Sequence, residues 1–516
     1  MSVTSSRRRL AFSANTIVVA GLTALGGALR LATADQSLFG DELSTYFIVS
    51  THGLGDTIAT VHNDIEITPP LSFVLAWLST RAGMTTELLR TPALLAGTAT
   101  IPLVYAIGAR TVGRTAGVVA AALTALAPFM IFYSAEARAY SPAILLVLLS
   151  SLALLTAVRD RRARWWAAYG ACSCAAVYTH YTRVFALAAQ LLWVLWAHPE
   201  ARKAAILANV GAAVAFLPWL GGLSNDLASP DTKVWSLLSP LTAHAVRLSI
   251  EHWTIGYPYA FSTTELRDLP GVVGLSAEAL GLALGLAGLA FALVRSRPRR
   301  VDSGVALVIA MALSAPVAEA LVSAVGANML TQPRNLAVSW PWFALGLAAV
   351  LVAGRPRLAI PAVGLVLAGF AVGAVKMVGG EDFRRPDFKA AARFIDREAA
   401  PSDYVIDGAV AFLAPGPVTG LDAALDRRHP IIRSGAPQQR TRNFSGTDTI
   451  LSSEEVVRRA DAATSRRLFV LATEVESTPS APGWDELVDA PARYRRVQTR
   501  TFPGAVQLAV HVYERR

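Results

Sequence analysis

Long apolar runs constrain this chain more than any other feature. An α-helix that crosses a bilayer needs about 20 apolar residues, and runs near this length recur along most of the sequence. Only 16% of the 516 residues are charged, which excludes an ordinary water-soluble or disordered protein. We therefore expect a polytopic α-helical membrane protein with about eleven transmembrane helices. The runs lie at about residues 11–32, 91–109, 116–133, 140–158, 165–181, 184–198, 204–220, 271–294, 304–325, 337–353 and 358–375.

The basic residues predict how these helices are oriented. In an arrangement of eleven spans, every cluster of Arg and Lys falls on one side of the membrane, and the side with the positive loops is the cytoplasm. We expect a multi-pass plasma-membrane protein with a cytoplasmic N-terminus, and we attribute the net charge of +10 to these loops rather than to nucleic-acid binding. The clusters are Arg7–Arg9, Arg110 with Arg114, Arg159–Arg164, Arg202 with Lys203, Arg295–Arg300 and Arg355 with Arg357.

One further apolar run, at residues 71–84, is short for a span and contains Arg81. Counting it as a span would place five arginine-rich loops outside the cell. We therefore predict a juxtamembrane helix here, within a long first outer loop at 33–90. Another long outer loop is expected later in the chain, at 221–270.

The chain changes character after the last run. Residues 388–398 have the apolar spacing of a helix, whereas residues 403–407, 467–475 and 506–514 are typical of strands. We predict two domains, a multi-span module at 1–375 and a small extracytoplasmic α/β domain at 376–516.

The first outer loop begins with two adjacent carboxylates, Asp41 and Glu42. A carboxylate at the membrane surface can serve as a general base. The alternative is a helix cap, since Asp is common at helix starts.

Farther along this loop, His62, Asp64 and Glu66 precede a Pro-Pro pair at 69–70. They could contact a substrate or cap the juxtamembrane helix. Their spacing matches no strong metal-ligand signature, so we leave the metal unknown and a divalent cation open as a cofactor.

Other polar residues lie at the remaining outer edges. Glu136 and Arg138 stand two residues apart in the short second outer loop. An Arg guanidinium suits a phosphate group, and the alternative is a local ion pair between these two side chains. His180 and Tyr181 lie between spans five and six, and Arg334 between spans nine and ten.

Taken together, these segments resemble the GT-C membrane glycosyltransferases, in particular the protein O-mannosyltransferase and aminoarabinose transferase branch. The resemblance covers most of residues 30–345 and rests on the order of the segments and their common side of the membrane. Relatives often have His or Lys directly before Pro-Pro, where this chain has Thr68. The segments are the acidic pair at 41–42, TPPL at 68–71, LLRTPALLAGTATIPLVYAIGAR at 88–110, APFMIFYSAEARAYS at 127–141 and YTHYTR at 178–183.

The resemblance implies transfer of a sugar from a polyprenyl-phosphate carrier to a cell-envelope glycan, lipid or protein at the outer face of the membrane. It maps the catalytic base to Asp41, with Glu42 beside it, and a second acidic position to Glu136. The residues themselves favour Arg138 and then Arg334 for the donor phosphate. We expect substrate contacts from His62, Glu66, His180 and Tyr181.

Two alternatives belong to other classes of protein. A transporter or flippase of lipid-linked sugars would also have many spans and buried charges, although such proteins often have repeated halves, which this chain lacks. A non-catalytic scaffold with a polymer-binding tail is the third interpretation.

Overall fold

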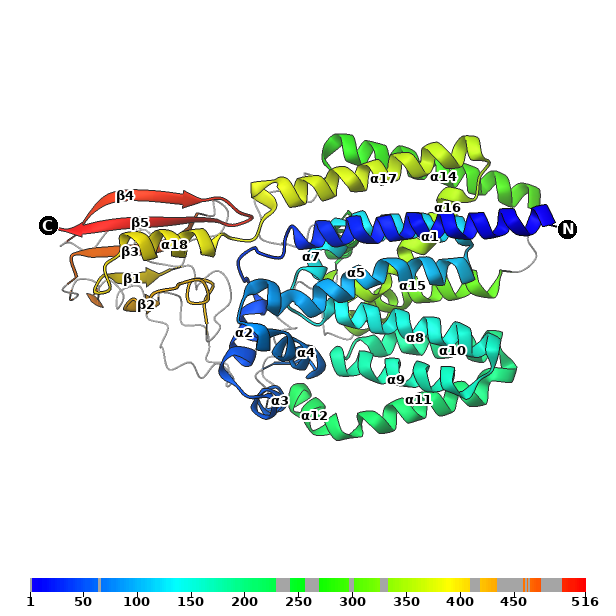
Figure 1. Ribbon diagram of the computed structural model, residues 1–516, viewed down its shortest axis with the longest axis horizontal. Helices are drawn as coiled ribbons and strands as arrows, with labels where there is room; N and C mark the ends of the chain where they lie inside the picture. The colour runs from blue at the N-terminus through cyan, green and yellow to red at the C-terminus, as the bar shows by residue number, and fades with distance from the viewer. Residues whose placement is uncertain are drawn as a thin grey trace.

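A helical bundle and a β-sheet follow one another along the long axis of the molecule (Figure 1). The N-terminus lies at the far end of the bundle, and the sheet lies beyond the opposite end. The computed structural model describes residues 2–63, 66–228, 242–255, 269–296, 301–324, 333–408, 418–433, 458–459, 462, 465–474 and 494–516.

Every predicted apolar run lies on a helix or on a closely spaced series of helices. The helices are α1 (Ser2–Leu31), α5 (Thr86–Thr111), α6 (Arg114–Leu126), α7 (Pro128–Ser134), α8 (Tyr140–Asp160), α9 (Ala163–Thr179), α10 (Arg183–Ala197), α11 (Arg202–Phe216), α12 (Leu220–Ala228), α14 (Gly271–Ser296), α15 (Ser303–Val322), α16 (Trp340–Val352) and α17 (Pro356–Gly379). Short 3-10 turns are η2 (Pro199–Ala201), η3 (Leu217–Trp219) and η8 (Pro333–Ser339).

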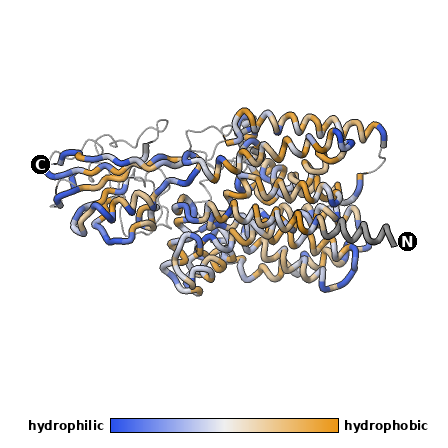
Figure 2. The backbone as a smooth tube through the Cα atoms, turned by 45° about the horizontal axis from the view of Figure 1, so that its top comes forward, coloured by the Kyte–Doolittle hydropathy of each residue, from blue (hydrophilic) through white to orange (hydrophobic). Residues whose placement is uncertain are grey.

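In the described part of the chain, eight helical segments are long and apolar enough to cross a membrane, or nine with the bent pair α6–α7. The predicted polytopic helical membrane protein is therefore confirmed. The count of eleven stays a prediction, since α9 has 17 residues and α10 has 15. Figure 2 shows apolar residues along the helices and hydrophilic segments toward their ends.

Helices α6 and α7 meet at a bend of 61°. Pro128 begins α7, and proline lacks the N–H that would continue the hydrogen-bond ladder. Arg30 of α1 is fully buried at this bend and donates to the carbonyl oxygens of Thr124 (3.1 Å) and Ala125 (3.4 Å) and to Ser134 Oγ (3.0 Å). The bend carries the chain directly into residues 135–139.

Three short helices separate α1 from α5, namely α2 (Asp41–Thr51), α3 (Leu54–His62) and α4 (Leu71–Ser79), followed by η1 (Thr80–Ala82). They lie at the end of the bundle that faces the sheet (Figure 1). Helix α4 covers the first nine residues of the predicted juxtamembrane run at 71–84, and nine residues are too few to cross a bilayer. Part of the predicted outer loop at 221–270 is also helical, as α13 (Ala243–Ile255).

The C-terminal region contains η9 (Glu381–Phe383), helix α18 (Phe388–Glu398) and a five-stranded sheet of order β2-β1-β3-β5-β4. Strand β1 pairs parallel with β2 and β3, whereas β5 runs antiparallel to β3 and β4. Apolar side chains of α18 and of β1, β3 and β5 form a shared core. The strands are β1 (Tyr404–Asp407), β2 (Ile431–Arg433), β3 (Arg467–Glu474), β4 (Tyr494–Phe502) and β5 (Gln507–Arg515).

Helix α18 and strands β1, β3 and β5 lie where the sequence predicts them, but β2 and β4 were not predicted. Strand β4 reads YRRVQTRTF, and only its two end residues are buried. An edge strand without a buried face has no alternation of apolar and polar residues for sequence analysis to detect.

Candidate active site

Asp41 is the first residue of α2 and is partly exposed. It follows Gly40, whose φ of 57° is readily adopted only by glycine. Its carboxylate Oδ2 lies 2.5 Å from Nη1 of Arg334, at the start of η8. Both side chains remain about one-third exposed, at 35% and 36%. The nearby Arg334 guanidinium holds the pKa of Asp41 below its usual value, although partial burial acts in the opposite direction. Asp41 is thus ionised and within reach of a solute.

Glu42 faces the opposite way, into the protein. Its fully buried carboxylate accepts hydrogen bonds from Arg90 Nε (2.7 Å) and Nη2 (2.6 Å), and from the Ala137 backbone N–H (2.8 Å). We expected the two adjacent acids to share one catalytic site. Because their side chains point apart on the helix, only Asp41 is open to a substrate.

Arg138 is held by Glu66 rather than by its sequence neighbour Glu136. Its Nη1 and Nη2 donate to the two carboxylate oxygens of Glu66, at 2.7 and 3.2 Å. Nη1 also lies 3.4 Å from the Asp41 carbonyl oxygen. This replaces the local Arg138–Glu136 pair considered above, and it brings Arg138 beside Asp41 and Arg334.

Glu136 is buried, and its Oε2 has no hydrogen-bond partner among the described residues. Burial, and then the nearby Glu42 carboxylate, raise the pKa of Glu136 to about 7. A carboxyl with a pKa near neutrality can exchange a proton under working conditions.

Three of the predicted substrate residues, His62, His180 and Tyr181, contact different neighbours. His180 lies beside Tyr140, the first residue of α8, with a ring separation of 6.0 Å. His62 and Tyr181 instead contact Trp219, the former through a ring contact at 5.4 Å and the latter as acceptor of the indole N–H at 2.9 Å. Tyr181 also donates to Asp226 of α12. His62 and Tyr181 thus lie against Trp219 and are not partners in the Asp41–Arg334 ion pair.

No group of three or more His, Cys, Asp or Glu side chains suited to a metal ion occurs in the part of the chain that the structure describes. Asp64, one of the three residues considered for a metal, lies outside that part. Gln332, beside Arg334, lies outside it as well.

Comparison with known proteins agrees with this architecture. Residues 68–221 match the family model of dolichyl-phosphate-mannose-protein mannosyltransferases. A solved structure of ArnT from Cupriavidus metallidurans bound to undecaprenyl phosphate is 14% identical, covers 96% of this chain and 97% of that chain, and superposes with a TM-score of 0.56. This chain has the fold of the GT-C membrane glycosyltransferases.

A second solved structure, the archaeal oligosaccharyltransferase AglB from Archaeoglobus fulgidus in complex with an inhibitory peptide and a dolichol-phosphate, is 13% identical, with a TM-score of 0.49. That match covers 88% of this chain and 69% of that chain. The sequence has no significant match among curated proteins.

An apolar groove lies between α10 and α15. Its volume is about 470 Å³, and its walls include Phe185, Leu192, Trp196, Leu313 and Val317. Arg183, two residues before Phe185, is fully buried and donates from Nη1 to the Asn335 carbonyl oxygen at 3.4 Å. Asn335 follows Arg334, so this hydrogen bond joins the start of α10 to η8.

Two buried arginines that contact Glu42 were not predicted as site residues. Arg90 begins an apolar run, and an arginine at the start of a span is a signal that could have identified it. Arg385 lies between the bundle and the sheet and approaches Glu42 to 3.5 Å. Only the folded chain brings it there, across more than 300 residues of sequence.

Proposed function

We propose that this protein transfers a sugar from a polyprenyl-phosphate carrier to a cell-envelope glycan, lipid or protein at the outer face of the plasma membrane. The observation that carries the proposal is the partly exposed Asp41–Arg334 pair with Arg138 beside it. Transfer from a lipid phosphate needs a group that accepts the acceptor's proton and groups that stabilise the departing phosphate. The Asp41 carboxylate and the two guanidinium groups can fill these roles. The GT-C fold, shared with a protein solved with undecaprenyl phosphate, supports this substrate class.

The two arginines are each paired with a carboxylate in this structure. Arg334 holds Asp41, and Arg138 holds Glu66. A donor phosphate that binds Arg334 competes with Asp41 for the same guanidinium. Donor binding therefore releases Asp41, and the base becomes available only when the leaving group is in place.

In the proposed reaction the acceptor hydroxyl attacks C1 of the donor sugar and transfers its proton to Asp41. The C1–O bond breaks, its electron pair leaves with the polyprenyl phosphate, and the arginines stabilise that charge. Direct displacement inverts the anomeric centre. Glu136 supplies a second carboxylate near the site, and His180 a polar contact for the substrate.

The apolar groove between α10 and α15 supports a lipid donor. A prenyl chain lying in it would pack against Phe185 and Leu313 while its phosphate lies near η8.

The experiment is transfer by the purified full-length protein from a panel of radiolabelled polyprenyl-phosphate sugars to a cell-envelope extract. Asp41→Asn should abolish transfer, whereas Asp56→Asn, an exposed acid of the same outer loop, should retain it. Absence of transfer from every donor by the wild type, with protein-dependent movement of the labelled lipid across vesicles, would instead identify a flippase.

A further inference from the structure

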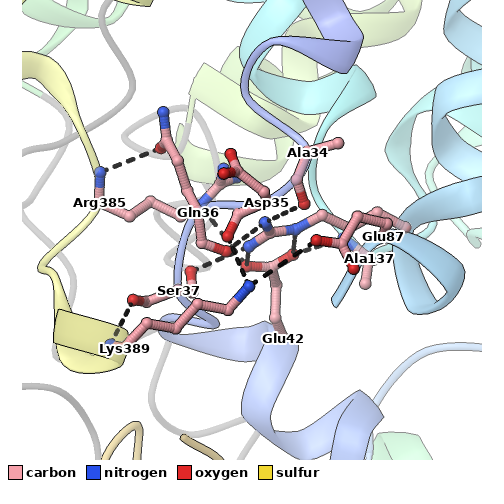
Figure 3. Close-up of polar contacts among 10 residues, drawn as sticks. Ala34, Asp35, Gln36, Ser37, Glu42, Glu87, Ala137, Arg385 and Lys389 are labelled. Carbon is pink, nitrogen blue, oxygen red and sulfur yellow. Dashed lines mark hydrogen bonds and ion pairs between the residues drawn. The ribbon is translucent and has the colours of Figure 1, made fainter. Parts of the chain in front are cut away.

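Arg385, a residue of the C-terminal region, extends its side chain toward the buried Glu42 (Figure 3). Arg385 lies between η9 and α18, and its side chain is only 2% exposed. Its Nε lies 3.5 Å from Glu42 Oε2, and its guanidinium carbon lies 4.4 Å from the ring centroid of Phe132 on α7. The C-terminal region therefore contacts both α2 and the helix that leads to Glu136.

This segment is fastened to the loop that leads into α2. The backbone N–H of Arg385 donates to Gln36 Oε1 at 3.2 Å, and that of Lys389 donates to Ser37 Oγ at 3.0 Å. Lys389 Nζ donates to the Asp35 carbonyl oxygen at 2.6 Å. Phe39 packs against the apolar core of the sheet region. Four of the six residues before Asp41 are thus in contact with the C-terminal region.

The charges in the cluster around Glu42 explain what Arg385 does there. Two carboxyl groups, Glu42 and Glu136, are buried together, and Arg90 pairs with the first of them. Carboxylates repel one another strongly where water is excluded. Arg385 is the second cation of the cluster, and its charge acts on both acids. Without it the buried acids would carry excess negative charge, and the loop that bears Glu136 and Arg138 would shift to relieve it.

We propose that Arg385 is a positioning residue of the catalytic centre, so that the C-terminal region completes the site rather than merely adjoining it. This inference rests on the proposed transfer reaction. Arg385 does not contact Arg334, which binds the donor phosphate in the proposed reaction. Its loss should therefore lower kcat by about tenfold or more while the donor KM changes by less than about threefold.

The pH profile gives a second readout that a purely structural role would not move. The charged groups that act on Glu136 are Glu42 and Asp41, which favour its protonated form, and Arg385 and Arg334, which favour its ionised form. Removing Arg385 should therefore shift the acid limb of the activity profile to higher pH.

The test compares full-length wild type, Arg385→Met and Arg385→Lys in the transfer assay, with kcat, donor KM, pH profile and thermal unfolding measured for each. Arg393→Met, which removes an exposed arginine of α18, is the matched control and should behave as wild type. We expect Arg385→Lys to recover most of the kcat lost in Arg385→Met, because the positive charge is retained.

If Arg385→Met has the kcat and the pH profile of the wild type, the role of Arg385 is overturned, and the proposed function is not. If Arg385→Met does not fold, the comparison is made between Arg385→Gln and Arg385→Lys. Equal kcat values and equal pH profiles in these two variants would overturn the proposed role of Arg385. Absence of transfer by the wild type would overturn the proposed function and this inference with it.

Discussion

Two adjacent acids, Asp41 and Glu42, differ in surroundings and therefore in role. Successive helical residues point about 100° apart, so one carboxylate faces the outside and the other faces Arg90. We assign Asp41 to the proposed chemistry and Glu42 to holding α2 against α5.

Glu42→Gln should destabilise the protein by about 3–5 kcal/mol, because it leaves the buried Arg90 without its anion. Thermal unfolding in detergent measures the effect. The double variant Glu42→Gln/Arg90→Met should lose less than the sum of the two single variants. A wild-type unfolding temperature for Glu42→Gln would contradict the assignment.

Arg334→Met should raise the donor KM by about 10- to 100-fold, since a hydrogen-bonded charge contributes about 1.5–3 kcal/mol. The same change removes the cation that lowers the pKa of Asp41, so that pKa should rise. Initial rates over a range of donor concentrations and pH values test both effects. An unchanged KM would remove Arg334 from the donor site.

The pKa of about 7 for Glu136 predicts how activity depends on pH. Below this value the carboxyl is protonated, and above it the carboxylate is ionised. If the reaction uses the ionised form, activity falls as the pH decreases through about 7, and Glu136→Gln removes that limb. An identical acid limb in Glu136→Gln would exclude Glu136 as its source.

The same pKa has a consequence for stability. The folded state binds the Glu136 proton more tightly than the unfolded state does, so this group favours folding at low pH. Its contribution decreases as the pH rises from the ordinary carboxyl range through about 7.

At the scale of elements, the bend between α6 and α7 directs residues 135–139 toward the site. Arg30→Met should lower the unfolding temperature and the transfer rate together, because it leaves the buried Thr124 and Ala125 carbonyls without this donor. Each unsatisfied buried group costs about 1–3 kcal/mol. Calorimetry or intrinsic fluorescence in detergent provides the measurement, and Arg30→Lys should be less affected. Unfolding of Arg30→Met at the wild-type temperature would show that the bend holds without Arg30.

The elements that sequence analysis located are those with a buried face. The apolar face of α18 contains Phe388, Ala391 and Ile395, which are buried, while Arg393 is exposed. This spacing is visible in the sequence. Strand β4 lacks such a face, and its pairing with β5 depends on backbone hydrogen bonds that leave no residue pattern.

At the scale of the whole molecule, the predicted orientation places the C-terminal end of α5 in the cytoplasm and the sheet outside the cell. In a variant with Cys172 and Cys174 replaced by Ser, Val497→Cys should react with a membrane-impermeant thiol reagent in intact cells. Val112→Cys should react only after permeabilisation. Labelling of Val112→Cys in intact cells would mean that the assigned orientation is wrong.

The sequence by itself determined the membrane class and the helical segments, because a helix in lipid needs a long apolar run. It also indicated which acidic and basic residues to consider, because charges at the edges of such runs are rare. It also identified Asp41, Arg138 and Arg334 as candidates. Only the tertiary structure decided their partners. Arg138 pairs with Glu66 instead of Glu136, Glu42 turns away from Asp41, and Arg385 reaches Glu42 from the far end of the chain. The physical reason is that ion pairs form between side chains that packing brings within about 4 Å, and spacing along the sequence does not encode that distance.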